Sequence, residues 1–286
     1  MSRNYGSGTS EAPKMDLSQI RLGFIGAGQM ASALAEGLLR AGVIAPSQIV
    51  ASDPDEAARQ RFARLTKAEV YPANAGVVEK ADVIILAVKP RLVQPVLEEL
   101  GPRTSDRLIV SLAAGIATRA ILSAIGQQAR VIRVMPNTAV RVLQGACAYC
   151  LAGKASEEDA RLVERLLGAV GLCLRVDESL MDAVTALSGS GPAIVYLLLE
   201  AMIDAGVLVG LPRPVARTLA LQTFRGAVEM TADTNLHPAE LAGQVTSPGG
   251  TTIAALKILE ERGVRGALMA AVERGAQRAA ELRAGS

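Results

Sequence analysis

The chain has 286 residues and half of them are hydrophobic, so it can form one large or two ordinary domains with a substantial core. Its 30 Lys and Arg residues nearly balance its 28 Asp and Glu residues, and aromatic residues make up only 2% of the chain. This even charge and scarcity of rings argue against nucleic acid or an acidic membrane surface as the main partner.

The N-terminal residues differ in composition from the rest of the chain. Residues 1–18 are predicted to be a disordered tail, because they are largely polar and rich in Gly and Ser, and they lack the apolar segment of a secretory signal. The longest apolar stretch, Ala193–Leu211, is interrupted by Glu200 and Asp204, so we expect no membrane span. Three cysteines are too few for a disulfide framework, which favours a reducing, cytoplasmic location.

Residues 19–177 alternate apolar strands with amphipathic helices. A parallel sheet built this way has right-handed crossovers and helices on both faces. Four strands are expected first, at Ile20–Ile25, Ile49–Ser52, Val83–Val88 and Leu108–Ser111, with helices at Met30–Ala41, Asp55–Leu65 and Leu92–Leu100. Further strands near Arg130–Val134, Gly145–Leu151 and Cys173–Val176, and a helix at Glu157–Val170, would extend the sheet.

Residues 178–286 show helical periodicity only. The helix beginning near Pro192 is apolar on both faces, so one neighbouring surface cannot bury it. Burial against a second subunit solves this problem, and we predict a dimer or larger assembly. The predicted fold class is α/β, with an N-terminal Rossmann-type parallel sheet followed by an all-helical C-terminal dimerisation domain.

A Gly-rich turn after the first strand predicts a dinucleotide site. The segment from Gly26 to Ala31 fits G-x-G-x-x-A between a strand and a helix. Gly26 allows the tight turn, Gly28 lets a pyrophosphate approach the backbone, and Ala31 lets the helix pack closely on the strand. The N–H groups at the start of the helix would stabilise the phosphates.

Asp53 ends the second strand and has two possible roles. It could accept hydrogen bonds from the ribose of NAD, or it could be a turn or N-cap residue before Pro54 and the next helix. Its charge would repel the 2′-phosphate of NADPH, whereas Ser52, Arg59 and Arg61 could offset that repulsion. The cofactor is therefore NADPH or NADH, with a slight lean to NADH.

The sequence contains few histidines and cysteines, residue types that often act as catalytic bases, nucleophiles or metal ligands. His237, the only histidine, precedes Pro238 and is expected to be structural, so neither a Ser-His-Asp triad nor a histidine-rich metal site is predicted. Cys147 and Cys150 have CxxC spacing, but they lie in a predicted strand without a second ligand pair, and we interpret them as structural thiols. No metal is expected. Hydride transfer suits this composition, because the cofactor carries the chemistry.

Two Gly- and Ser-rich loops in the helical half are candidate substrate sites. In the first, Leu187–Pro192, Ser188 and Ser190 are expected to contact substrate. The second, Thr246–Thr252, precedes a helix predicted at Ile253–Arg262, whose first N–H groups could bind a carboxylate. The Thr252 hydroxyl could donate to, or accept from, a ring nitrogen.

Together these motifs resemble those of pyrroline-5-carboxylate reductases, in family order and spacing. The resemblance covers about Ile20 to Leu282, and the Ser-Pro-Gly-Gly-Thr-Thr loop after His237 is its most specific part. The matching segments are Gly23–Met30, Ala87–Pro90, Arg133–Thr138, Leu187–Ala193 and Val245–Thr252.

The resemblance implies reduction of Δ1-pyrroline-5-carboxylate to L-proline by NAD(P)H. It also implies an interlocked homodimer and, in many members, a homodecamer. The implied cofactor contacts are Ile25, Gly26, Ala27, Gly28, Gln29, Met30, Ser52, Asp53, Asn74, Ala87, Val88 and Lys89, with Ala114, Gly115 and Asn137 at the nicotinamide. The implied substrate contacts are Gly250, Thr251 and Thr252, with the hydroxyl of Thr252 near the imine nitrogen.

Two departures from the family pattern stand out. Many relatives have Pro where Ala139 stands, which concerns local loop shape, and eukaryotic NADPH users often have Ser where Asp53 stands, which concerns cofactor preference. Three alternatives remain: reduction of another cyclic imine, a β-hydroxyacid dehydrogenase, and a non-catalytic NAD(P) sensor. The dehydrogenase would need a catalytic Lys in the helical half, where Lys257 lies outside any matching motif.

Overall fold

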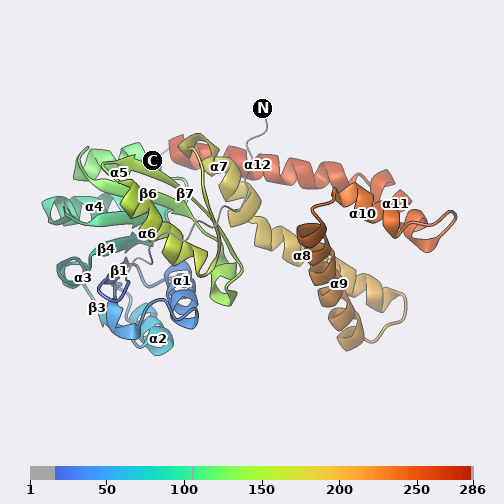
Figure 1. The fold of residues 1–286 in the computed structure, drawn as a ribbon, viewed down its shortest axis with the longest axis horizontal. Coiled ribbons are helices and arrows are strands. Elements are labelled where there is room, and N and C mark those ends of the chain that lie inside the picture. Colours follow the sequence, from blue (N-terminus) through green and yellow to red (C-terminus); the bar gives the residue numbers. More distant parts are fainter. Residues whose placement is uncertain (1–16, 105, 285–286) are drawn as a thin grey trace. The chain divides into compact units, whose positions relative to one another are not determined.

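A computed structural model describes residues 17–104 and 106–284 of the chain. The chain divides into two compact units, one ending at Glu178 and the other beginning at Ser179 (Figure 1). Most of the predicted tail, residues 1–16, lies outside the described residues. Leu17, which the tail prediction includes, is buried in the core of the first unit.

One sheet organises the described part of the first unit. Its strands follow the order β3-β2-β1-β4-β5-β6-β7-β8. They are β1 (Leu22–Ile25), β2 (Ile49–Ser52), β3 (Glu69–Tyr71), β4 (Val83–Leu86), β5 (Leu108–Ser111), β6 (Arg130–Met135), β7 (Gly145–Gly153) and β8 (Gly171–Arg175). Strands β1, β2, β4 and β5 are buried at every position, as expected for parallel strands covered on both faces.

The last two strands depart from the fully parallel sheet that we predicted. Neighbouring strands from β3 to β6 pair in parallel, whereas β7 runs antiparallel to β6, and β8 runs parallel to β7. The connection from β6 to β7 holds only a short 3₁₀ helix, Thr138–Val142, which is too short to return the chain to the same end of the sheet. The chain therefore reverses direction there.

Helices cover both faces of the sheet (Figure 1). Residues of α1, α2 and α6 pack in one core cluster with Phe24, and residues of α3, α4 and α5 pack in another with Ile25, because successive strand residues point to opposite faces. These helices are α1 (Gln29–Arg40), α2 (Glu56–Thr66), α3 (Ala75–Lys80), α4 (Val93–Leu100), α5 (Thr118–Ile125) and α6 (Glu157–Gly168). Short 3₁₀ turns lie at Pro46–Gln48, Pro90–Leu92, Gly101–Thr104 and Glu178–Leu180.

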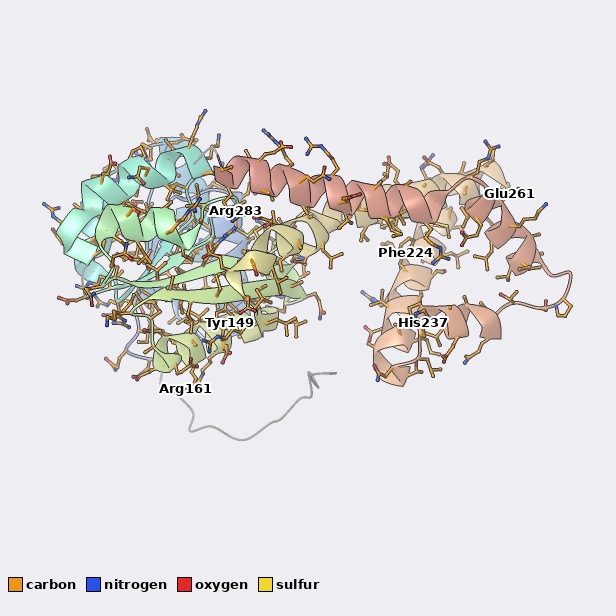
Figure 2. All side chains as sticks on the ribbon, turned by 90° about the horizontal axis from the view of Figure 1, so that it is seen from above. Tyr149, Arg161, Phe224, His237, Glu261 and Arg283 are labelled. Atoms are coloured by element: carbon orange, nitrogen blue, oxygen red, sulfur yellow. The ribbon has the colours of Figure 1, made fainter. Side chains whose placement is uncertain are left out.

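The second unit is helical throughout its described residues. Its helices are α7 (Met181–Val184), α8 (Gly191–Leu208), α9 (Arg213–Thr234), α10 (Pro238–Gln244), α11 (Thr251–Glu261) and α12 (Val264–Ala284), with a π-helical turn at Thr185–Gly189. Helix α8 has no buried residue and α9 has only Ala216 and Ala220, so most side chains of the two helices are partly or fully exposed (Figure 2).

The first candidate substrate loop is helical, which corrects our prediction. Thr185–Gly189 forms the π-helical turn, and the N–H of Ser190 donates to the carbonyl of Thr185 at 2.9 Å. Ser188 donates its hydroxyl to the carbonyl of Val184. The i+5 hydrogen bond carries the backbone through the Gly-Ser-Gly sequence without ending the helix, and π-helical turns of this kind are frequent at functional sites.

The segment Glu178–Leu208 is unusually apolar. By length and composition alone it could cross a membrane, because an 18-residue window within it has a mean hydropathy of 1.6, even though Glu200 and Asp204 interrupt the segment. A core helix of a soluble protein passes the same test. Apolar side chains of α8 and its end are strongly exposed within the single chain, with Leu208 at 87% and Val209 at 79%. Such a surface indicates a partner that covers it.

Candidate functional site

The turn after β1 has the geometry that the Gly-rich motif predicts. Gly26 has φ +95°, and its N–H donates to the carbonyl of Ser52 at 2.8 Å. A Cβ at this position would lie 2.9 Å from the carbonyl oxygen of Ala87 and 3.1 Å from a methyl of Val88. Both the backbone conformation and the close approach of the neighbouring strand end therefore require glycine here.

Gly28 has a different role from Gly26. It is the N-cap of α1 with φ −74°, and a Cβ there would meet nothing within 4 Å. The first intrahelical hydrogen bond runs from Ser32 N–H to the Gly28 carbonyl, so the N–H groups of the first turn precede it and face outward. Ala31 is fully buried, as its predicted packing role requires. The helix start is thus an open anion site.

A cavity of about 800 Å³ lies beside this helix start. It is formed where the chain leaves β1, β2 and β4, and β1 lies between the other two in the sheet. This is the position at which open parallel sheets bind dinucleotides. Nine predicted cofactor residues line the cavity: Gly26, Gly28, Gln29, Ser52, Asp53, Asn74, Ala87, Val88 and Lys89.

The Asp53 carboxylate braces the Gly-rich turn. One oxygen accepts from the N–H of Ala27 at 2.9 Å, and the other accepts from the N–H of Asp55 at 2.9 Å. Ser52, fully buried, donates its hydroxyl to the amide oxygen of Asn74, whose nitrogen donates to Glu99. Asp53 therefore has the turn role that was considered for it, since both oxygens hold backbone N–H groups, whereas the N-cap of α2 is Asp55.

Six predicted cofactor residues do not line this cavity. The side chains of Ile25 and Ala27 are buried in the core, so only the backbone groups of these residues can contact a ligand. Met30 packs against the core, and Ala114 and Gly115 follow β5, with Gly115 at φ +74°. The sixth, Asn137, lies in the connection between β6 and β7.

Asn137 organises that connection. Its amide oxygen accepts from the N–H groups of Ala139 and Ala146, both at 3.2 Å, so it joins the start of the 3₁₀ turn to the start of β7. Proline has no N–H, so a relative with Pro at the position of Ala139 lacks the first of these bonds. Because this chain has Ala139 where many relatives have Pro, its loop has one local hydrogen bond that those relatives lack.

The structure adds lining residues to the predicted cofactor contacts, and one of them, Arg61, was considered in the sequence only as a charge that could offset Asp53. Arg91, Pro95 and Glu99 lie one turn apart on or just before α4, and Ala58 and Arg61 lie one turn apart on α2. Residues three or four positions apart share one face of a helix. This periodicity was visible in the sequence, but which face of each helix borders the cavity depends on how the helix packs on the sheet.

The second candidate loop forms a tight turn before α11. Gly249 has φ +68°, Gly250 donates its N–H to the Ser247 carbonyl at 3.0 Å, and a Cβ on Gly250 would lie 2.3 Å from the Ser247 hydroxyl. Helix α11 begins at Thr251, two residues earlier than predicted. Its first intrahelical bond runs from Ala254 to Gly250, so the N–H groups of Thr251 and Thr252 precede it, as predicted for a carboxylate site.

The histidine and the CxxC cysteines have structural positions. His237, labelled in Figure 2, caps α10 by accepting the N–H of Ala239 on Nδ1 at 3.2 Å. Cys147 and Cys150 are three positions apart in β7, so they point to opposite faces of the sheet and cannot share a ligand. Burial raises the pKa of the Cys147 thiol to about 12 and that of Cys150 to about 11, which makes both unreactive.

Comparisons with protein families divide the chain in the same way as its fold. Residues 21–115 match the family described as "NADP oxidoreductase coenzyme F420-dependent". Residues 178–282 match the family described as "Pyrroline-5-carboxylate reductase dimerisation". The helical unit therefore carries a dimerisation module.

Individual relatives match nearly the whole chain. A pyrroline-5-carboxylate reductase of Glycine max is 45% identical over 91% of this chain and 95% of that protein. One of Methanosarcina acetivorans is 44% identical over 92% of this chain and 97% of that protein. Among solved structures, the pyrroline carboxylate reductase of Plasmodium falciparum with NADP bound has a TM-score of 0.87 at 33% identity, covering 93% of this chain and 99% of that one. The chain belongs to the pyrroline-5-carboxylate reductase family.

Proposed function

We propose that the chain reduces Δ1-pyrroline-5-carboxylate to L-proline, the last step of proline biosynthesis, with a hydride from NADPH or NADH. Two sites in the chain together support this proposal. One is the phosphate-binding turn at Gly26 and Gly28, and the other is the helix start at Thr251 and Thr252, which offers N–H groups to a carboxylate. Both occur in one chain of the reductase family.

The first unit would hold the dinucleotide. Its cavity is large enough for one, the open space at Gly28 leaves room for a pyrophosphate, and the start of α1 offsets phosphate charge. When bound, the reduced nicotinamide supplies the hydride. By family resemblance, Ala114, Gly115 and Asn137 border the nicotinamide, and Ile25, Ala27 and Met30 contribute the rest of the turn.

The second unit would hold the substrate. In this proposal the N–H groups of Thr251 and Thr252 bind the carboxylate, and the Thr252 hydroxyl hydrogen-bonds the imine nitrogen. Ser188 in the π-helical turn and Ser190 just after it contact the ring. Hydride transfer requires that the substrate held at the start of α11 meet the reduced nicotinamide of the same or a neighbouring protomer. The imine must carry a proton to accept hydride, and that proton comes from solution or from water near Thr252.

Replacing Thr252 with alanine tests its role. We expect kcat/KM for the imine to fall roughly 30- to 150-fold, about 2–3 kcal/mol of transition-state binding, because the hydrogen bond to the imine nitrogen is lost. The matched control is Thr252→Ser, which keeps a hydroxyl and should retain most activity. Unchanged steady-state kinetics in Thr252→Ala would remove Thr252 from the mechanism.

A direct assay tests the activity itself. Purified protein should oxidise NADPH or NADH only when Δ1-pyrroline-5-carboxylate is present, and the six-membered homologue and the 2-carboxylate isomer assayed beside it report on ring specificity. Cofactor reduction driven by proline at high pH would exclude a non-catalytic sensor. Failure of the imine to stimulate cofactor oxidation would contradict the proposal.

A second copy of the chain is the proposed cover for the apolar helices. Exposed apolar residues recur on α8, α9 and α11, and this surface suits burial between protomers better than an isolated chain. We propose a cytoplasmic homodimer, able to assemble further into a decamer, without membrane or nucleic acid partners.

Light scattering coupled to size exclusion checks the assembly. We expect a mass at least twice the 29.7 kDa of one chain, in a protein that stays in the supernatant without detergent. An active monomer, or a chain that needs detergent to stay in solution, would contradict the proposed assembly.

A further inference from the structure

The two possible cofactors differ at one place. NADPH carries a phosphate on the 2′ oxygen of its adenosine ribose, where NADH carries a hydroxyl. A residue that prefers NADPH must therefore supply positive charge or hydrogen-bond donors at the ribose end of the cavity. This inference rests on the proposed use of a nicotinamide cofactor and asks which one the cavity selects.

The ribose end can be located from the end of β2. In dinucleotide-binding sheets the residue there meets the adenosine ribose, and in this chain that residue is Asp53. Three residues that follow β2 in the chain line the same cavity: Asp55, the N-cap of α2, Arg61 of α2, and Asn74, the N-cap of α3. A 2′-phosphate would thus lie among the side chains of Asp53, Asn74 and Arg61.

The Asp53 carboxylate is engaged by backbone donors. Its two oxygens accept from the N–H groups of Ala27 and Asp55, both at 2.9 Å. These bonds draw the negative charge toward the Gly-rich turn and the start of α2. The repulsion that Asp53 would exert on a phosphate is therefore partly offset by two N–H dipoles.

Three arginines of α2 differ in their surroundings. Arg59 donates to the backbone carbonyls of Asp53 at 2.8 Å and Pro54 at 2.9 Å, so it holds the turn together. Arg64 is exposed and does not line the cavity. Arg61 lines the cavity, and its buried Nε has no hydrogen-bond partner among residues 17–104 and 106–284.

A buried guanidinium donor without an acceptor is costly, and an anion bound beside it would remove that cost. The ionisable side chains lining the whole cavity are balanced, with Asp53, Asp55 and Glu99 against Arg61, Lys89 and Arg91. The net charge of the cavity therefore does not select between the two cofactors, and the positions of the charged side chains near the ribose must do so. The local arrangement at the ribose end leaves Arg61 as the cation that is not committed to the protein.

We infer that Arg61 recognises the 2′-phosphate of NADPH and makes this chain an NADPH-preferring enzyme despite the acidic residue at the end of β2. Arg61 is a specificity residue in this inference, and it takes no part in hydride transfer. The guanidinium would donate to the phosphate oxygens in the planar, bidentate geometry that arginine favours.

Replacing Arg61 with methionine removes the charge and keeps the aliphatic stem. KM for NADPH should rise roughly 10- to 100-fold, the range expected for loss of a charge-assisted contact, while KM for NADH changes far less. Arg61→Lys should recover part of the NADPH preference. The matched control is Arg64→Met on the same helix, which should leave both KM values unchanged.

A binding measurement separates this inference from the proposed activity. Calorimetric titration should show 2′,5′-ADP binding more tightly than 5′-AMP to the intact protein, with the difference lost in Arg61→Met and kept in Arg64→Met. Equal KM increases for both cofactors, an unchanged NADPH KM, or a wild-type preference for NADH would each overturn the inference. An Arg61-dependent preference for 2′,5′-ADP without any imine reduction would uphold it and contradict the proposed activity instead.

Discussion

The Gly26→Ala substitution is expected to destabilise the first unit by about 3 kcal/mol, lowering its melting temperature by roughly 6–12 °C. Alanine is strained at φ +95°, and its Cβ would lie 2.9 Å from the Ala87 carbonyl oxygen. The turn would have to move away from the end of β4, taking the start of α1 with it. We therefore also expect NADPH affinity to fall more than about tenfold, measured by fluorescence titration.

Gly28→Ala is the matched control for Gly26→Ala. At φ −74° the backbone accepts alanine, and the new Cβ meets no protein atom within 4 Å, so stability should be unchanged or slightly higher. Cofactor affinity should nevertheless fall, since the methyl occupies the space that a pyrophosphate needs. Equal melting temperatures for the Gly26 and Gly28 variants would contradict the strain argument.

The second large loss of stability is expected when Arg133 in β6 is replaced. Its side chain is only 2% exposed, and one guanidinium nitrogen lies 3.3 Å from Glu178, the last residue of the first unit. Glu178 in turn accepts from the N–H of Thr118 at 2.7 Å and from its hydroxyl at 2.6 Å. Since Ala117, the N-cap of α5, provides no side-chain cap, Glu178 caps α5 from 60 residues away.

Arg133→Met should destabilise the first unit by about 2–3 kcal/mol, below the full cost of breaking a buried pair because Glu178 is partly exposed. Thermal melting measures this, with a fall of roughly 4–12 °C. The control is Arg175→Met, which breaks the exposed pair between Arg175 and Glu157 and should cost less than about 1 kcal/mol. Similar melting temperatures for the two variants would contradict a structural role for Arg133.

The difference in stability between wild type and Arg133→Met should depend on pH, and the direction of that dependence follows from the pKa of Glu178. Burial by itself raises the pKa of Glu178, but the hydrogen bonds from Thr118 and the charge of Arg133 outweigh it and leave the pKa below its usual 4.5. A carboxyl with a lowered pKa stabilises the fold fully above its unfolded value and loses that contribution as pH falls through the folded value. The gap between wild type and Arg133→Met should thus be constant at neutral pH and shrink below about pH 4. A gap that persists in acid would contradict the ion pair as its source.

Local sequence patterns predicted the central strands and the phosphate-binding turn correctly. Ile49–Ser52 and Leu108–Ser111 were predicted with their observed bounds, because short apolar runs between polar segments are typical of strands buried on both faces. The turn at Gly26 was predictable for a similar reason. The motif that indicates it lies within one strand, one turn and one helix, although Ser52 and Asp53 also hold the turn by hydrogen bonds.

Short or atypical elements escaped prediction. Strand β3 has three residues and α3 has six, too few for periodicity to stand out, and the eight-residue α5 was also missed. The Gly-Ser-Gly sequence near Ser190 looked like a loop, yet a π-type hydrogen bond continues the helix through it. The reversed direction of β7 depends on how chain segments meet in the sheet, which local propensity does not encode.

The sequence by itself determined the fold class, the dinucleotide turn and the family, since these depend on motifs whose residues are neighbours along the chain. Tertiary structure alone decided which side chains are committed to the protein and which are available to a ligand. Asp53 is held by Ala27, 26 positions away, and Glu178 caps α5 across 60 positions. Arg59 and Arg61 are two positions apart on one helix, yet Arg59 binds backbone carbonyls and Arg61 faces the cavity. Hydrogen-bond partners are set by proximity in space, and folding brings distant segments together in ways that spacing along the chain does not record.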